Sequence, residues 1–94
     1  MLQTGRRSRT PRMEILWRPN SVGHPRLGLV VPRHGQSAVS RNRLRRRLRE
    51  LARRRVLPDL EAIDLIIRSR RRAYVARLEE LAADLDRWVR SLSA

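Results

Sequence analysis

The sequence predicts a single α+β domain, a two-layer α/β sandwich whose elements follow the order β-β-α-β-α. Three observations support this fold class. Apolar and polar residues alternate in Met13–Arg18 and in Arg26–Val31, as in strands with one buried face. Apolar residues recur three and four positions apart in 40–54 and again in 74–92, as in helices with one apolar stripe. The 94 residues are enough for one such domain.

The N-terminal third of the chain predicts an arm followed by two strands. Residues 1–11 are polar and basic, so we expect a basic arm or an edge strand ahead of a core that spans 12–94. Turn-forming residues in 19–25 join the two strand-like segments. This arrangement predicts an antiparallel hairpin with a long loop.

The stretch 40–54 predicts a helix with two contrasting faces. On a helical wheel, its apolar residues fall within a stripe about 100° wide, the width that a core-facing helix needs. These residues are Leu44, Leu48, Leu51 and Ala52. The opposite side carries Arg43, Arg46, Arg47, Arg49, Arg53 and Arg54. Ser37 or Ser40 is suited to cap the helix at its start, and Pro58 predicts that it ends near Arg54.

The C-terminal third predicts one more strand and one more helix. Ile63–Arg68 reads as a strand, and the intervening helix favours a parallel arrangement with the second strand. Segment 74–92 predicts an amphipathic helix with Trp88 in its apolar stripe. Its acidic residues are balanced by arginines, which predicts a solvated outer face. Those acids are Glu79, Glu80, Asp84 and Asp86.

The charge of the chain indicates a polyanionic partner. There are 23 basic residues, all of them arginine, against 9 acidic ones, which gives a net charge of +14. Guanidinium groups are planar and form paired hydrogen bonds with phosphate. Between Arg26 and Asp59 the only acid is Glu50, whereas ordinary solvated faces mix both signs. The arginine helix therefore favours nucleic-acid binding over a merely solvated surface.

Several other classes of function are disfavoured by the composition. The chain has no cysteine, and His24 and His34 lack neighbouring residues that would complete a metal site. Asp59 and Asp64 flank a strand, where caps and turns explain them better than a catalytic metal does. We find no candidate catalytic group, no membrane-spanning apolar run and no signal peptide, so we expect a cytoplasmic binding protein.

Two segments resemble the signature of the protein subunit of bacterial ribonuclease P. Gly28–His34 resembles the family's G-L-x-V strand and the two basic residues after it, and Ala38–Glu50 resembles its Ala-Val, R-N-R and K/R-R-x-x-R pattern. Asp64–Ile67 with Arg70 is similar to a later strand of the family. The resemblance covers nearly the whole chain.

The resemblance implies a subunit of an endoribonuclease holoenzyme in which a catalytic RNA, with bound magnesium, removes the 5′ leader of precursor tRNA. The polypeptide would bind the catalytic RNA, in a 1:1 complex, and the leader, without being the catalyst and without a cofactor of its own. The residues that the resemblance assigns to RNA binding are Arg33, His34, Arg41, Asn42, Arg43, Arg45, Arg46, Arg49 and Arg70.

The resemblance also implies a left-handed strand–helix–strand crossover, contrary to the usual right-handed rule. Family members usually carry a helix ahead of the segment that resembles Gly5–Arg18, so we expect that helix to be missing here. A general RNA-binding structural protein, such as a ribosomal component, remains the alternative, because it needs only the arginine surface.

Overall fold

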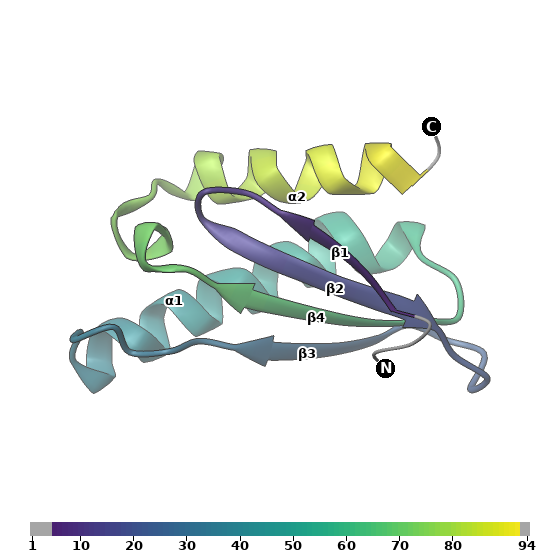
Figure 1. Cartoon of the computed structure of the whole chain (residues 1–94), viewed down its shortest axis with the longest axis horizontal. Helices are drawn as coiled ribbons and strands as arrows, with labels where there is room; N and C mark the ends of the chain where they lie inside the picture. Colours follow the sequence, from purple (N-terminus) through teal and green to yellow (C-terminus); the bar gives the residue numbers. More distant parts are fainter. Residues whose placement is uncertain (1–4, 93–94) are drawn as a thin grey trace.

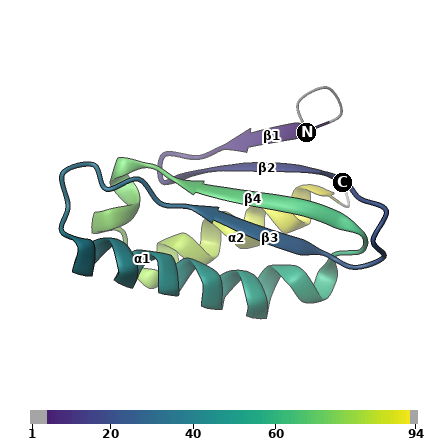
Figure 2. The same cartoon turned by 90° about the horizontal axis from the view of Figure 1, so that it is seen from below.

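The computed structural model describes residues 5–92, which form one four-stranded sheet with two long helices (Figure 1). The strands are β1 (Arg6–Arg9), β2 (Met13–Pro19), β3 (Arg26–Val30) and β4 (Ile63–Ser69), and the helices are α1 (Ala38–Leu51) and α2 (Leu78–Leu92). Short helical turns are η1 (Ala52–Val56), η2 (Leu57–Asp59) and η3 (Arg71–Val75). Both long helices cover the same face of the sheet (Figure 2), which confirms the two-layer sandwich.

The strand order is β1-β2-β4-β3, so the central strand β4 comes last in the chain. It pairs antiparallel with β2 and parallel with β3, which confirms the predicted parallel arrangement. The predicted hairpin between β2 and β3 is wrong, because β4 lies between them. The apolar run Leu65–Ile67 suits the central position of β4, because a continuously apolar strand is best buried with a neighbour on each side.

The crossover from β3 through α1 to β4 is left-handed. In Figure 1 both strands point to the left, with β4 above β3, and Figure 2 shows that α1 lies behind the sheet of the first view. This handedness is the one that the family resemblance implies, and it departs from the common right-handed rule. As a result, the opposite face of the sheet is left without a covering helix among residues 5–92.

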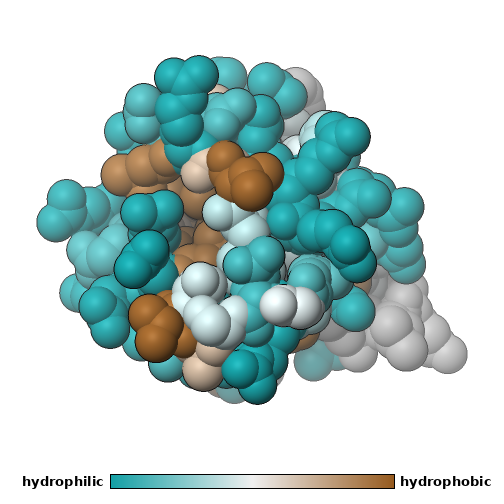
Figure 3. All heavy atoms as spheres, turned by 90° about the vertical axis from the view of Figure 1, so that its left-hand side faces the viewer, coloured by the Kyte–Doolittle hydropathy of each residue, from teal (hydrophilic) through white to brown (hydrophobic). Residues whose placement is uncertain are grey.

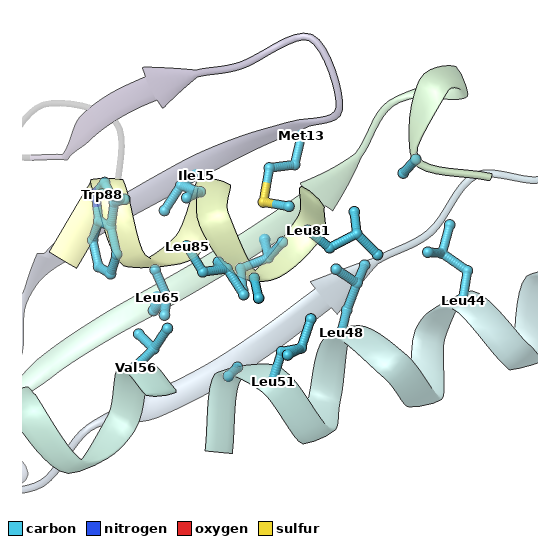
Figure 4. Close-up of a cluster of buried hydrophobic side chains, with 14 of the residues drawn as sticks. Met13, Ile15, Leu44, Leu48, Leu51, Val56, Leu65, Leu81, Leu85 and Trp88 are labelled. Carbon is cyan, nitrogen blue, oxygen red and sulfur yellow. The ribbon is translucent and has the colours of Figure 1, made fainter. Parts of the chain in front are cut away.

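The core lies between the sheet and the two helices (Figure 4). Met13 and Ile15 of β2 and Leu65 of β4 point into it, and all three are 0–1% exposed. The helices add Leu44, Leu48, Leu51, Leu81, Leu85 and Trp88. Trp88 meets the ring of Trp17 edge-on, with centroids 5.2 Å apart, which confirms both tryptophans on the core side. Burial of one such side chain contributes about 1.5–3 kcal/mol.

Helix α1 begins and ends close to the predicted positions. Ser37 is its N-cap, since the backbone N–H of Ser40 donates to the Ser37 hydroxyl at 3.1 Å. The α-helical pattern ends at Leu51, and the π-helical turn η1 then carries the chain to Val56. This wider turn keeps Ala52 and Val56 on the buried side, so helical backbone extends past the predicted end.

The N-terminal segment agrees with the predictions, whereas α2 differs from them in two respects. The predicted arm or edge strand in 1–11 contains the edge strand β1, and residues 1–4 lie outside the described part. Helix α2 begins at Leu78 rather than at residue 74, and Val75 is 84% exposed. The predicted solvated position of Asp84 is wrong, because this carboxylate is 1% exposed beneath the turn between β1 and β2.

Candidate RNA interface

The outer surface of α1 carries a stripe of polar side chains three and four residues apart. Leu44 and Leu48 hold the helix against the sheet and so fix which side faces outward. The stripe lines a shallow hollow of about 330 Å³ formed by Asn42, Arg45, Arg46 and Arg49, and all four are exposed. Arg43 is exposed on the other flank of the helix, so the predicted RNA-binding residues occupy two sides of one rod.

Most of these guanidinium groups have no partner within residues 5–92. Glu50, the nearest acid, pairs with Arg53 at 3.3 Å and Arg54 at 3.4 Å, beyond the end of α1. On α1, the arginines whose side chains have no ion pair or hydrogen bond with residues 5–92 are Arg43, Arg45, Arg46, Arg47 and Arg49. An uncompensated row of this kind suits a polyanion such as a phosphate backbone.

Arg41 differs from the other predicted arginines of α1. It is half-buried, and its Nε–H donates to the carbonyl oxygen of Val31 at 2.8 Å. The hydroxyl of Tyr74 donates to the next carbonyl, that of Pro32, at 2.6 Å. Two side chains from separate elements therefore fix the connection between β3 and α1.

The connection continues into a tight turn that presents the predicted basic pair. The backbone N–H of Gln36 donates to the Arg33 carbonyl at 2.8 Å, and both central residues are left-handed, with φ of 50° at His34 and 82° at Gly35. This conformation suits glycine and costs a histidine roughly 1–2 kcal/mol. The His34 ring lies edge-on to the Tyr74 ring, with centroids 6.4 Å apart, and Arg33 and His34 are both exposed.

A larger hollow of about 800 Å³ opens at the same end of the molecule. It lies where four parts of the chain meet: the turn between β1 and β2, the end of β4, η3 and His34. Its lining holds five arginines and no acid. The lining residues are Arg9, Thr10, Pro11, His34, Arg68, Ser69, Arg70, Arg71 and Arg72. Hydrophilic side chains cover most of this end, with separate apolar patches between them (Figure 3).

This hollow brings together His34 and Arg70, which the sequence assigned from separate motifs. Arg70 is held in place twice, because its Nη1 donates to the Thr10 carbonyl at 2.8 Å and its backbone N–H donates to the Arg12 carbonyl at 2.8 Å. Four other arginines of the lining, Arg9, Arg68, Arg71 and Arg72, were not among the predicted site residues. The arginine run at 70–72 was a visible signal, but the position of Arg9 depends on how β1 pairs.

The uncovered face of the sheet extends from this hollow along the strands. Directly paired residues share a face, so the face carries five arginines and two acids: Arg7, Arg9, Arg18, Arg26, Arg68, Glu14 and Asp64. Its centre is apolar, with Leu16 and Ile66 beside Gly28. The face thus offers positive charge at both ends and an apolar middle.

Each acid on this face is neutralised by arginine. Glu14 lies 3.1 Å from Arg9 and 3.5 Å from Arg7. Asp64 accepts hydrogen bonds from Arg26 at 2.7 and 2.9 Å and from the Asn20 amide at 3.0 Å. The bonds from Arg26 and then Asn20 lower the pKa of Asp64 to about 2. With five arginines against two acids, the face carries a net positive charge at neutral pH.

The described residues contain no cluster of three or more histidine, aspartate or glutamate side chains that would hold a metal ion. Within 5–92, no helix has both the length and the apolar character that a bilayer crossing requires.

Comparison with known proteins identifies one family. The family model described as Ribonuclease P matches residues 1–93. A ribonuclease P protein component from Photobacterium profundum is 37% identical over 94 residues, and the alignment covers 99% of this chain and 79% of that protein. One from Erwinia tasmaniensis is 43% identical over 68 residues, which is 71% of this chain and 56% of that protein. The solved RNase P protein of Thermotoga maritima superposes with a TM-score of 0.74 at 27% identity, covering 88% of this chain and 85% of that one.

Proposed function

Because this chain belongs to the ribonuclease P protein family, we propose that it binds the catalytic RNA of ribonuclease P through α1 and the 5′ leader of precursor tRNA across the open face of its sheet. As a protein component of ribonuclease P, it belongs to the ribonucleoprotein that processes tRNA 5′ ends. We further propose that the protein forms a 1:1 complex with the catalytic RNA and that it is cytoplasmic.

The observation that carries the proposal is the unpaired arginine row on α1. Arg43, Arg45, Arg46 and Arg49 make no ion pair within residues 5–92, although each is held on a rigid helix. Surfaces of like charge repel, and neighbouring arginines at these spacings destabilise an isolated helix by a few tenths of a kcal/mol per pair. An RNA backbone would relieve that repulsion, because each phosphate supplies the charge that the chain itself does not.

The second contact, with the leader, is supported by the shape and charge of the open sheet face. The arginine-lined hollow at its end contains His34 and Arg70, and the face continues past Leu16 and Ile66 towards Arg26. Arginines can hold successive phosphates of a single strand, while the apolar middle offers contact to bases or sugars. Extended RNA along the strands would thus meet charge at both ends of its path.

In this proposal the chemistry of cleavage belongs to the RNA. The described residues offer no metal-binding cluster, and the positive charge of the hollow and of α1 acts on phosphates. Magnesium would be held by the catalytic RNA, and the protein would lower the repulsion between that RNA and the leader. Its contribution is then substrate affinity and a reduced requirement for magnesium.

Reconstitution with the cognate catalytic RNA tests the proposal. Cleavage of a precursor tRNA and its dissociation constant are measured at low magnesium with and without the protein, using precursors with a long and a one-nucleotide leader. We expect the protein to increase the affinity for the long leader selectively. If the affinity for the long-leader precursor is the same with and without the protein, the proposed leader contact is refuted.

A general RNA-binding protein would behave differently in the same assay. An unrelated structured RNA, added as competitor at raised salt, would displace a nonspecific or ribosomal-type binder as readily as the catalytic RNA does. We expect it to compete poorly here. Arg87→Gln, which removes an exposed arginine from α2, is the matched control and should leave both RNA contacts unchanged.

A further inference from the structure

A buried carboxylate from α2 lies directly beneath the arginine-lined hollow. Asp84 is 1% exposed, and its Oδ2 accepts a hydrogen bond from the Thr10 hydroxyl at 2.9 Å. Its Oδ1 accepts from Nη1 of Arg12 at 3.0 Å, and Nη2 of Arg12 continues to Glu80 at 2.9 Å. A buried carboxylate is costly unless it is paired and hydrogen-bonded, and Arg12 and Thr10 supply both kinds of contact.

Thr10 transmits this contact to the turn between β1 and β2. The hydroxyl oxygen of Thr10 accepts from the backbone N–H groups of Arg12 at 3.2 Å and Met13 at 3.1 Å. The backbone N–H of Thr10 also donates to the Met13 carbonyl at 2.8 Å. The Thr10 hydroxyl also lies 3.3 Å from the Met13 carbonyl oxygen, farther than from Asp84. Together these hydrogen bonds fix the turn and with it the direction of the Thr10 carbonyl.

That carbonyl is the group that holds Arg70. Nη1 of Arg70 donates to it at 2.8 Å, while the other donors of this guanidinium make no further hydrogen bond within residues 5–92. Arg70 itself lines the hollow together with Thr10. A continuous path of hydrogen bonds thus runs from the core side of α2 to a guanidinium on the RNA-facing side.

We propose that Asp84 is a positioning residue for RNA binding, because through Thr10 it directs the guanidinium of Arg70 into the hollow. This inference rests on the proposed function, since it assigns Arg70 to the leader contact. A held guanidinium loses less side-chain freedom on binding than a free one, which favours affinity for phosphate. The same path explains why an acid is buried under a surface with five arginines.

Thr10→Val tests the inference in the reconstituted holoenzyme. This variant keeps the shape of the side chain and the Asp84–Arg12 ion pair, but it removes the hydroxyl that links them to the turn. The measurement is the affinity for a long-leader precursor tRNA as a function of salt. We expect the slope of log K against log salt to fall by about 0.7, the value for one phosphate contact with a single strand, and the affinity at 0.15 M salt to fall about fourfold.

Thr10→Ser keeps the hydroxyl and should restore the wild-type slope. In an Arg70→Gln background, Thr10→Val should change neither the slope nor the affinity further, because its effect passes through Arg70. A merely structural role would lower stability in both backgrounds and leave the slope unchanged, and this result would overturn the inference. Asp84→Ala is a second variant: it removes the acceptor of the Thr10 hydroxyl, so it should reduce the slope as Thr10→Val does.

Asp86→Asn is the matched control on α2, because Asp86 pairs with Arg55 at 2.8 Å away from the hollow. It should behave like the wild type. If the wild-type protein itself adds no affinity for the leader, the proposed function fails and this inference fails with it. If the wild type adds affinity and Thr10→Val binds with an unchanged slope, only the positioning role is overturned.

Discussion

The Nε–H of Arg41 donates to the carbonyl oxygen of Val31 at 2.8 Å, and this bond joins the first turn of α1 to the residue that follows β3. The other donors of the same guanidinium make no hydrogen bond within residues 5–92, so they are available to RNA. Unlike Arg43, Arg45, Arg46 and Arg49, Arg41 therefore anchors the helix, in addition to the RNA contact that we propose for all five.

Replacing Arg41 with alanine should affect both folding and RNA binding. We expect the free energy of unfolding to fall by about 1.5–3 kcal/mol, the contribution of a hydrogen bond with one charged partner. Urea unfolding measures this change. Arg45→Ala, at an exposed position one turn later, is the control and should unfold like the wild type; equal stabilities of the two variants would contradict the anchoring role.

Replacing Arg43 and Arg46 with alanine should weaken RNA binding and leave folding intact. Both side chains are exposed and unpaired in the described part of the chain, so their removal costs the fold little. Each lost phosphate contact should lower the salt slope of log K by about 0.7–0.9. This slope is obtained by measuring the affinity for the catalytic RNA at a series of salt concentrations. A slope equal to that of the wild type would exclude both residues from the interface.

Leu48→Ala should act on folding alone. Leu48 is 0% exposed between α1 and the sheet, and a leucine-to-alanine change in a core costs about 2–5 kcal/mol. Denaturant titration followed by circular dichroism measures the loss. Val39→Ala, on the same helix but 68% exposed, should change stability little, and a comparable loss there would refute the assignment of the buried stripe.

Asp64 should make stability depend on pH in the acid range. Its folded-state pKa is about 2, below the ordinary value of 3.8, so between these values the unfolded chain binds a proton that the folded chain does not. The stabilisation from Asp64 is therefore complete above pH 3.8 and is lost as the pH falls to about 2. The difference in unfolding free energy between the wild type and Asp64→Asn should shrink over that window, and a constant difference would contradict it.

The sequence predicted where the helices and strands lie better than it predicted which strands pair with one another. The leucine spacing of α1 and the alternation of β2 are local patterns, and both elements occur where they were expected. The position of β4 is a long-range property, since nothing within residues 63–69 says which strands will flank it. For the same reason, the turn-forming residues 19–25 suggested a hairpin between β2 and β3 that the sheet does not contain.

The candidate site likewise contains residues that local sequence patterns reveal and residues that only long-range contacts bring together. The arginine row of α1 was visible because helical spacing alone places Arg45, Arg46 and Arg49 together. The arginine-lined hollow was only partly visible, because Arg9 joins it through the pairing of β1 with β2. Asp84 looked like a surface acid because the helical pattern grouped it with Glu80 and Asp86 on a charged face. Its partners in space, Thr10 and Arg12, are more than seventy positions away in the sequence.

The late position of β4 in the chain also has a consequence during synthesis. Neither β2 nor β3 can gain its central partner until residues 63–69 have left the ribosome, so the sheet cannot assemble progressively from the N-terminus. The leucine face of α1 emerges before the surface that will cover it is complete. The nascent chain is thus most vulnerable to misassociation just before β4 appears, when its arginines are already exposed to cellular polyanions.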